Sequence, residues 1–231
     1  MKSPSGPPKQ RKMDDPGVFF RFAHDLRSGL RTVVTRLQLV QKSEASQLPE
    51  EERLWLDQAL AAAHDLNGLI NAMSAYAGSN TEEGSENLRL LLRGLLLERK
   101  PELEKMGGRV EAINELSNPV PGGLKWVLKE LLSNACRFRA PERPLRIRIA
   151  TRLTDSSLAV DVQDNGMGVE ETYLEMIFQP FFSVHPRHEF PGYGLGLATC
   201  RRMLESWGGS IHATAPGEGL TLHISIPLEK M

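Results

Sequence analysis

The 231-residue sequence predicts an α+β protein: an N-terminal antiparallel helical hairpin, paired with a second copy into a dimeric four-helix bundle, followed by an α/β sandwich with a mixed sheet. Two stretches near the start carry apolar residues spaced alternately four and three positions apart, which is the pattern of packed helices. The second half of the chain mixes period-two alternation with amphipathic helical spacing, and this combination is typical of a sandwich of helices on a sheet.

The composition excludes several classes of protein. The chain has 28 Lys and Arg against 29 Asp and Glu, a net charge of −1, so nothing in its charge favours binding to nucleic acid. No stretch approaches the roughly 20 apolar residues of a membrane span. The two cysteines, Cys136 and Cys200, have no metal-ligand spacing, and the sequence is interpreted as that of a cytoplasmic protein without a membrane span.

The first 78 residues contain a tail and the hairpin. Residues 1–17 include four prolines and few apolar side chains, which predicts a flexible tail, and the hairpin is expected over 18–78. The first apolar seam consists of Phe19, Ala23, Leu26, Leu30, Val33, Leu37 and Val40; the second consists of Trp55, Ala59, Ala62, Leu66, Leu69, Met73 and Tyr76. The second stripe is widened by Leu56, Leu60, Ala63 and Ile70. Stripes this wide cannot be covered within one hairpin, which predicts a homodimer.

A small, acidic segment at 79–86 predicts a linker, and a second domain is expected over 87–231. Within that domain the apolar spacing predicts helices over 88–97, 124–136 and 195–207. Alternation predicts strands over 145–152, 158–164, 210–215 and 220–226.

Four short motifs follow one another in this second domain. They are Glu130–Ala135 (ELLSNA), Asp164–Gly168 (DNGMG), Phe178–Phe182 (FQPFF) and Gly192–Leu197 (GYGLGL). In this order they resemble the N, G1, F and G2 boxes of the ATPases that include histidine kinases, type II topoisomerases, mismatch-repair ATPases and large heat-shock chaperones. Each motif alone is common, but four in order over residues 86–227 are specific. The resemblance implies an ATP-binding domain that uses ATP and Mg²⁺.

The residue types fit this chemistry. The carboxylate of Asp164, at the end of a strand, can accept a hydrogen bond from the adenine amine, and Gly166 and Gly168 allow the backbone to approach a flat ring. Asn134 offers a neutral oxygen to Mg²⁺. A glycine-rich helix start exposes N–H groups that suit phosphates; it comprises Gly192, Gly194, Leu195 and Gly196.

The resemblance adds roles that spacing does not give. It implies that Arg137 and Phe138 are the basic and aromatic residues after the N box, and that Glu130 is a second carboxylate near the metal and nucleotide. It also implies that residues 179–192 form a mobile lid.

The hairpin carries the motif that separates kinases from related ATPases. Residues 22–30 (FAHDLRSGL) resemble the H box of histidine kinases, which makes His24 the expected phospho-acceptor. His24 follows seam residue Ala23, so it lies beside the buried stripe and faces solvent, as a phospho-acceptor must. The resemblance gives Asp25 the role of base on the imidazole. The phosphoryl group would then pass to an aspartate on a response-regulator receiver domain, and a separate sensor protein is a further partner.

Two residues depart from the usual H box. Gly29 stands in place of the usual proline, and Ser28 stands where phosphatase-competent members have Thr or Asn, so Ser28 is the candidate phosphatase residue. The sequence leaves two other functions open: a histidine phosphotransfer hub or pseudokinase with a decayed ATP site, and a conformational ATPase. It does not fix whether phosphorylation runs within or between subunits, because that depends on the handedness of the hairpin loop.

Overall fold

The computed structural model describes residues 16–44, 48–78, 84–113, 116–186, 189–190 and 192–230, with side chains from Leu26 onward except near the gaps and the C-terminus. The chain divides into two compact units after Gly78. No described helix is both long and apolar enough to cross a membrane.

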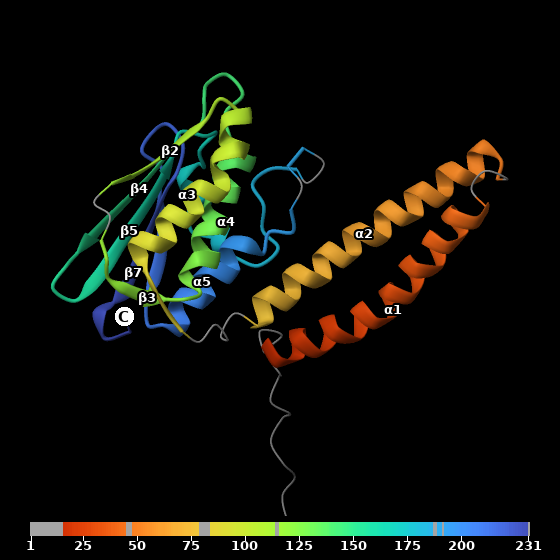
Figure 1. Ribbon diagram of the computed structural model, residues 1–231, viewed down its shortest axis with the longest axis horizontal. Coiled ribbons are helices and arrows are strands. Elements are labelled where there is room, and N and C mark those ends of the chain that lie inside the picture. The colour runs from red at the N-terminus through yellow and green to blue at the C-terminus, as the bar shows by residue number, and fades with distance from the viewer. Residues whose placement is uncertain are drawn as a thin grey trace, which may run out of the picture. The chain divides into compact units, whose positions relative to one another are not determined.

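The first unit is an antiparallel pair of helices, α1 (Pro16–Glu44) and α2 (Glu50–Gly78), as the heptad spacing predicts (Figure 1). Helix α1 begins with a proline inside the predicted tail, at the position where a missing N–H costs nothing. Three glutamates, Glu50 to Glu52, form the first turn of α2, where they complement the helix dipole. The remainder of the predicted tail, residues 1–15, lies outside the described residues.

Polar contacts join the two helices at both ends. Arg27 of α1 donates to Ser74 Oγ of α2 at 2.6 Å, and Gln41 near the far end of α1 donates to Asp57 at 3.0 Å. The Nε atom of Arg27 is buried and has no hydrogen-bond partner among the residues that the structure describes.

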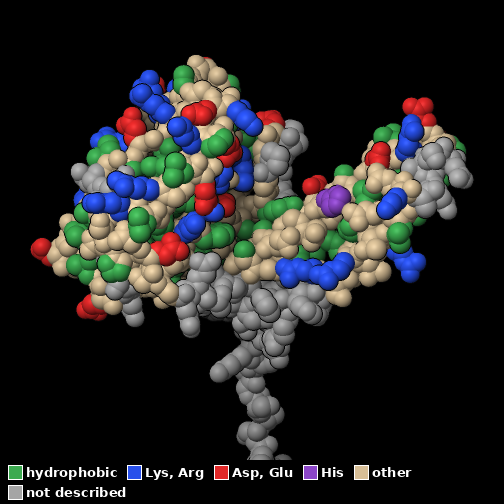
Figure 2. Space-filling model, in the orientation of Figure 1, with side chains coloured by type: hydrophobic (Ala, Val, Ile, Leu, Met, Phe, Trp, Pro, Cys, Tyr) green, Lys and Arg blue, Asp and Glu red, His purple; other side chains and the backbone are tan. Residues whose placement is uncertain are grey.

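The hairpin buries only one of its apolar stripes. The buried side chains of α2 are those that widen the predicted stripe, together with one seam residue: Leu56, Leu60, Ala63, Ile70 and Met73. Much of the predicted seam is exposed instead, including Val33 (50%), Trp55 (57%) and Leu66 (43%). Figure 2 shows hydrophobic side chains at the surface of this unit.

The second unit contains a five-stranded sheet with helices on one face (Figure 1). The strands are β2 (Arg109–Ile113), β4 (Arg146–Leu153), β5 (Ser157–Asp164), β6 (Ser210–Thr214) and β7 (Thr221–Pro227). Their order is β2-β4-β5-β7-β6, and only the β2–β4 pair is parallel, so the sheet is mixed as predicted.

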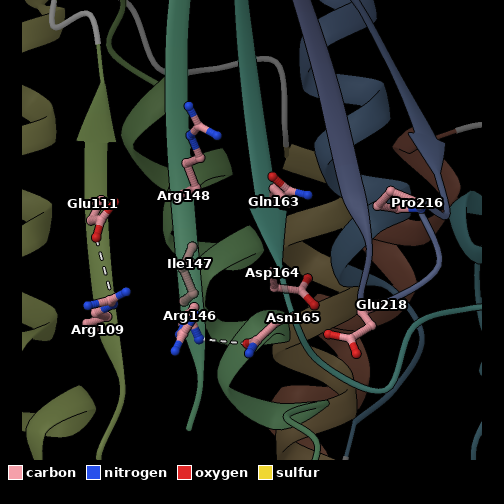
Figure 3. A pocket seen from close by; sticks show the side chains of 10 residues that line it. All are labelled: Arg109, Glu111, Arg146, Ile147, Arg148, Gln163, Asp164, Asn165, Pro216 and Glu218. Carbon is pink, nitrogen blue, oxygen red and sulfur yellow. Dashed lines mark hydrogen bonds and ion pairs between the residues drawn. The ribbon is translucent and has the colours of Figure 1, made fainter. Parts of the chain in front are cut away.

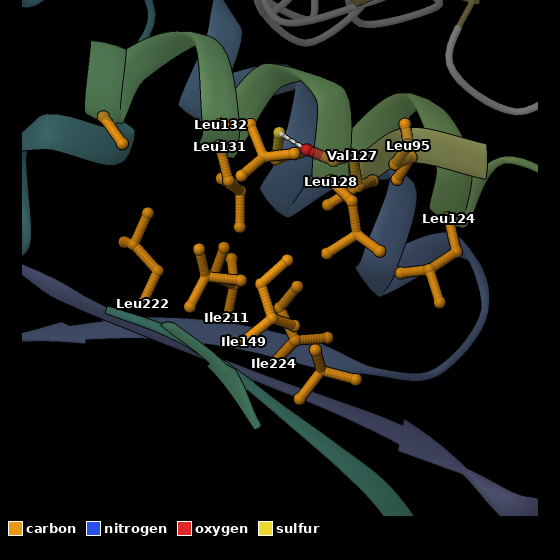
Figure 4. Close-up of a cluster of buried hydrophobic side chains, with 14 of the residues drawn as sticks. Leu95, Leu124, Val127, Leu128, Leu131, Leu132, Ile149, Ile211, Leu222 and Ile224 are labelled. Atoms are coloured by element: carbon orange, nitrogen blue, oxygen red, sulfur yellow. Dashed lines mark hydrogen bonds between the residues drawn. The ribbon is translucent and has the colours of Figure 1, made fainter. Parts of the chain in front are cut away.

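Three helices cover the inner face of the sheet: α3 (Leu88–Lys105), α4 (Leu124–Arg137) and α5 (Gly196–Ser206). The core forms where the apolar stripe of α4 meets the inward residues of the strands (Figure 4), and it includes Val127, Leu128, Leu131, Ile149, Val160 and Ile224. Burial of these residues is the main stabilising contribution, about 1.5–3 kcal/mol for each large side chain.

Several features of the second unit were not predicted from the sequence. Helix α3 continues eight residues beyond the predicted end, through Pro101, because Leu103 is buried in the core and the ion pair of Arg99 with Glu102 (2.6 Å) spans the proline. Strand β2 follows directly after the glycines that end this helix. A separate two-stranded sheet pairs β1 (Ser85–Asn87), which starts inside the predicted linker, with β3 (Pro119–Pro121).

Candidate active site

Helix α4 presents a row of polar residues beside its buried stripe. Glu130, Asn134 and Arg137 follow one another at intervals of four and three residues, so they lie on one face of the helix. Arg137 Nη1 lies 3.4 Å from Asn134 Oδ1, to which it donates. Burial raises the pKa of the Glu130 carboxyl, although Arg137 and Arg99 oppose this by stabilising the ionised form.

The glycine-rich segment lies directly against this row. A Cβ at Gly196, the first residue of α5, would collide with the Glu130 carboxylate, and a Cβ at Gly192 would lie 3.0 Å from Arg137 Nη1. Gly194 adopts a positive φ of 66°, which disfavours any other residue there. Leu195 is buried and immediately precedes α5. The site therefore combines a helix N-terminus, which favours anions, with a carboxylate and an amide oxygen.

Asp164 lies at the end of β5 with the parity of buried Val160 and Val162, so its side chain faces the helices. Burial raises the pKa of Asp164, while backbone N–H groups of Gly166 and Leu220 act in the opposite direction. The Gly166 N–H donates to Asp164 Oδ1 at 2.8 Å. An ionised carboxylate can accept about four hydrogen bonds, so Asp164 keeps acceptor capacity for a ligand.

The loop after Asp164 is tied to the end of α4. The Met167 N–H donates to the carbonyl of Phe138 at 2.9 Å, and a Cβ at Gly166 would collide with that oxygen. Gly168 has a positive φ of 75° and packs against Gly219. The Phe138 ring contacts His185 and Phe190 of the predicted lid segment, with ring centroids 5.6 and 5.4 Å apart.

The sequence-predicted residues of the second unit thus gather around the C-terminal half of α4. The predicted residues of the hairpin are placed less completely. Backbone positions of His24 and Asp25 lie within α1, but their side chains are outside the described residues. Ser28 is exposed on α1, one turn further along.

Similarity to known proteins agrees with this geometry. The family of histidine kinase-, DNA gyrase B- and HSP90-like ATPases matches residues 119–230. The sensor histidine kinase GtrS of Pseudomonas aeruginosa is 32% identical over 93% of this chain and 42% of its own length. The chain belongs to the sensor histidine kinases.

Further relatives of this sensor histidine kinase support the assignment. The phytochrome-like protein Cph1 of Synechocystis is 28% identical over 89% of this chain and 28% of its own length, so the chain spans less than half of these two relatives. The catalytic domain of histidine kinase ThkA superposes with a TM-score of 0.57 at 26% identity, covering 65% of this chain and all of that domain. ShkA, solved with AMPPNP, shares the fold over 92% of this chain and 46% of its own, with a TM-score of 0.71 and 22% identity.

The kinase fold also uses residues that sequence reasoning missed. Arg143 donates to two successive carbonyls of the Asp164 loop, Asn165 O at 2.7 Å and Gly166 O at 2.9 Å. Gly219 packs so closely on the Asp164 carbonyl that a Cβ would collide with it. The turn around Gly219 is visible in the sequence, but its contact with Asp164 is not, and Arg143 carries no local signal.

A second missed contact fixes the F box. Arg201 of α5 forms a bidentate pair with Glu175 (2.5 and 3.2 Å) and lies 4.1 Å from the centroid of the Phe178 ring. Planar stacking together with a forked ion pair is a role that arginine fills and lysine does not. Arg201 therefore holds the segment just before the predicted lid against α5, the helix that begins in the glycine-rich segment.

Proposed function

We propose that this chain is the catalytic core of an ATP-dependent protein-histidine kinase that phosphorylates His24 and passes the phosphoryl group to an aspartate of a response-regulator receiver domain. The observation that carries the proposal is the assembly of Glu130, Asn134 and Asp164 with the glycine-rich start of α5, in a chain that also has an H box on a helical hairpin. An intact nucleotide site of this kind argues against a pseudokinase.

Each residue has a distinct task in nucleotide binding. Asp164 accepts the hydrogen bond from the adenine amine, and Gly166 and Gly168 leave room for the ring. The N–H groups at the start of α5 and the guanidinium of Arg137 receive phosphate oxygens. Phe138 and the ring of Phe190 enclose the base from the lid side.

The oxygen donors on α4 fit a hard cation. Asn134 Oδ1 and the Glu130 carboxylate would hold Mg²⁺, which prefers oxygen ligands and neutralises phosphate charge when bound. The contact of Arg137 with Asn134 is long, at 3.4 Å, so it is readily exchanged for such a ligand.

The chemical step is an in-line displacement. A neutral imidazole nitrogen of His24 attacks the γ-phosphorus, the bond from that phosphorus to the bridging oxygen breaks, and ADP leaves with the electron pair. Asp25 hydrogen-bonds the other ring nitrogen and stabilises the proton there as positive charge develops. The need for ATP places this reaction in the cytoplasm.

The exposed seam of the hairpin supports a homodimer. Val33, Trp55 and Leu66 are each at least 43% exposed within one hairpin, and a second hairpin would cover them in a four-helix bundle.

The test of this function is transfer of label from [γ-³²P]ATP to the full chain. His24→Gln should abolish acid-labile phosphorylation and leave ATP binding unchanged. His64→Gln is the matched control, because His64 is exposed on α2 and also precedes Asp-Leu, yet should remain fully active. Label that persists on His24→Gln would disprove the assignment of the acceptor.

A further inference from the structure

The outer face of the five-stranded sheet, opposite the helices, contains a cavity of about 380 Å³. It is lined by residues of β2, β4 and β5, with Asp164 and Asn165 at the end of β5, and by the turn between β6 and β7 (Figure 3). Its volume is that of a small-molecule site. Three arginines line it: Arg109 on β2, and Arg146 and Arg148 on β4.

The positions of these arginines place like charges next to each other, which lowers the stability of the sheet when no ligand is bound. Arg109 and Arg146 are register partners on adjacent strands, and like charges directly opposite each other destabilise a sheet. Glu111 is the register partner of Arg148, but its carboxylate forms its ion pair with Arg109, at 3.7 Å. The one nearby carboxylate on β2 is therefore used by Arg109, and β4 keeps two positive charges.

Both of these β4 guanidinium groups lack protein partners. No ion pair or side-chain hydrogen bond within the described ranges engages the guanidinium of Arg146 or Arg148, and the contact of Arg146 with Asn165 is made by its backbone N–H. The next outward arginine of β4 is different, because Arg152 lies 3.8 Å from the Asp161 carboxylate. The outward arginines of β4 that lack an ion pair are thus the two that line the cavity, whose other charged residues are Arg109, Glu111, Asp164 and Glu218.

We infer that this cavity is a binding site for a small organic phosphate, which borders the ATP site at Asp164. Two adjacent guanidinium forks can each bind phosphate oxygens in a bidentate manner, which a single-point cation cannot do. The amide of Gln163 and the exposed carboxylate of Glu218 line the same cavity and can pair with hydroxyl or amino groups of the ligand.

The alternation of β5 sets the boundary between the two sites. Gln163 lies on the outer face, whereas its neighbour Asp164 has the parity of buried Val160 and Val162. As the last residue of the strand, Asp164 also lines one end of the cavity (Figure 3). Arg146, Arg148 and Gln163 therefore belong to the outer face alone, while Asp164 borders both sites.

Inorganic pyrophosphate is the probe for this site, titrated into the full chain at constant ionic strength. The side-chain amide signal of Gln163 in ¹⁵N nuclear magnetic resonance reports the outer cavity, and calorimetry gives the affinity. The wild-type protein should show saturable binding that shifts this signal. The double variant Arg146→Gln/Arg148→Gln should bind pyrophosphate at least about tenfold more weakly, the loss expected for a charge-assisted hydrogen bond.

Arg152→Gln is the matched control, because it removes one outward positive charge from the same strand outside the cavity. It should keep the wild-type affinity. Arg146, Arg148 and Arg152 all lie on the exposed face of the sheet, so their substitution should not disturb the core. An unchanged thermal unfolding transition verifies the fold of each variant. The inference is overturned if the Gln163 signal does not move, if the double variant binds as tightly as wild type, or if Arg152→Gln weakens binding equally.

Discussion

At the scale of single residues, the most informative side chain is Asp164. Its carboxylate is partly buried and accepts from the Gly166 N–H, and burial raises its pKa. A buried carboxylate with capacity for further hydrogen bonds costs folding free energy and is typical of a ligand site. Substitution of Asp164 should therefore separate its effect on the free energy of unfolding from its effect on ATP binding.

Asp164→Asn should weaken ATP binding by roughly tenfold to a hundredfold, since one charge-assisted hydrogen bond is lost and an amide donor can face the adenine amine. Calorimetry on the full chain measures this. Asp161→Asn, on the same strand but facing outward toward His223, is the control and should retain affinity. Unchanged affinity in Asp164→Asn would remove Asp164 from the site.

The raised pKa of Asp164 gives the same variant a pH signature. As pH rises from the ordinary aspartate pKa through the raised one, the unfolded state ionises first, so this residue lowers the free energy of unfolding across that window. Asp164→Asn should abolish that contribution, and at neutral pH its stability should not fall below that of wild type. Urea unfolding at several pH values measures the difference.

Ser28 is the residue on which we expect dephosphorylation to depend. It lies on α1 four residues after His24, and residues at i and i+4 share a helix face. Its hydroxyl is exposed but is less restricted in χ1 than that of threonine. We expect little phosphatase activity toward a phosphorylated receiver domain in the presence of ADP, and a gain in Ser28→Thr or Ser28→Asn. Fast dephosphorylation by wild type that survives Ser28→Ala would contradict this role.

At the scale of elements, the site depends on a loop that neighbouring segments hold in place. The Asp164 loop is fixed from one side by Arg143, which is 29% exposed, and from another by close packing of Gly219. Asn165 adds side-chain hydrogen bonds to the Arg146 N–H (2.7 Å) and the Pro144 carbonyl (3.0 Å). These contacts orient the Gly166 N–H that in turn orients the carboxylate of Asp164.

Arg143→Gln should therefore raise the KM for ATP several-fold with a smaller effect on kcat, because the loop loses its alignment but no catalytic group is removed. The free energy of unfolding should fall by about 1–3 kcal/mol. Glu218→Gln is the control: it removes only the 3.7 Å ion pair of Arg143 and should leave the KM unchanged. Equal losses in the two variants would assign the effect to the ion pair and not to the carbonyl contacts.

At the scale of the whole molecule, the hairpin surface determines the assembly. Part of the apolar pattern is buried within one hairpin and part is exposed, as Leu60 (6%) and Trp55 (57%) illustrate on the same helix. An exposed apolar seam along both helices indicates an interface.

The full chain should sediment at twice its 25.7 kDa mass. Leu66→Glu places an unpaired carboxylate in the seam and should shift the protein to monomer, because burying that charge is costly. Ala61→Glu adds the same charge at an exposed position of the same helix, away from the seam, and should leave the dimer intact. A monomeric wild-type chain would contradict the four-helix bundle.

The sequence by itself determined the order of the main elements and the family, and it supplied the residues proposed for the site. Heptad spacing predicted α1 and α2, and alternation predicted β4, β5, β6 and β7, because these signals are local and periodic. The four motifs together with the H box predicted the sensor kinase family, because they too are local in the sequence. The three-residue strand β1 lacks an apolar pattern, and it forms only because β3 pairs with it.

The tertiary structure decided what depends on residues distant in sequence. The clamp of Arg143 on Asn165 and Gly166 joins residues about 20 positions apart, and the pair of Arg201 with Glu175 joins residues 26 apart. The cavity of Arg146 and Arg148 depends on how the strands are ordered across the sheet. Such contacts leave no periodic trace, since they arise from which segments the buried core brings together.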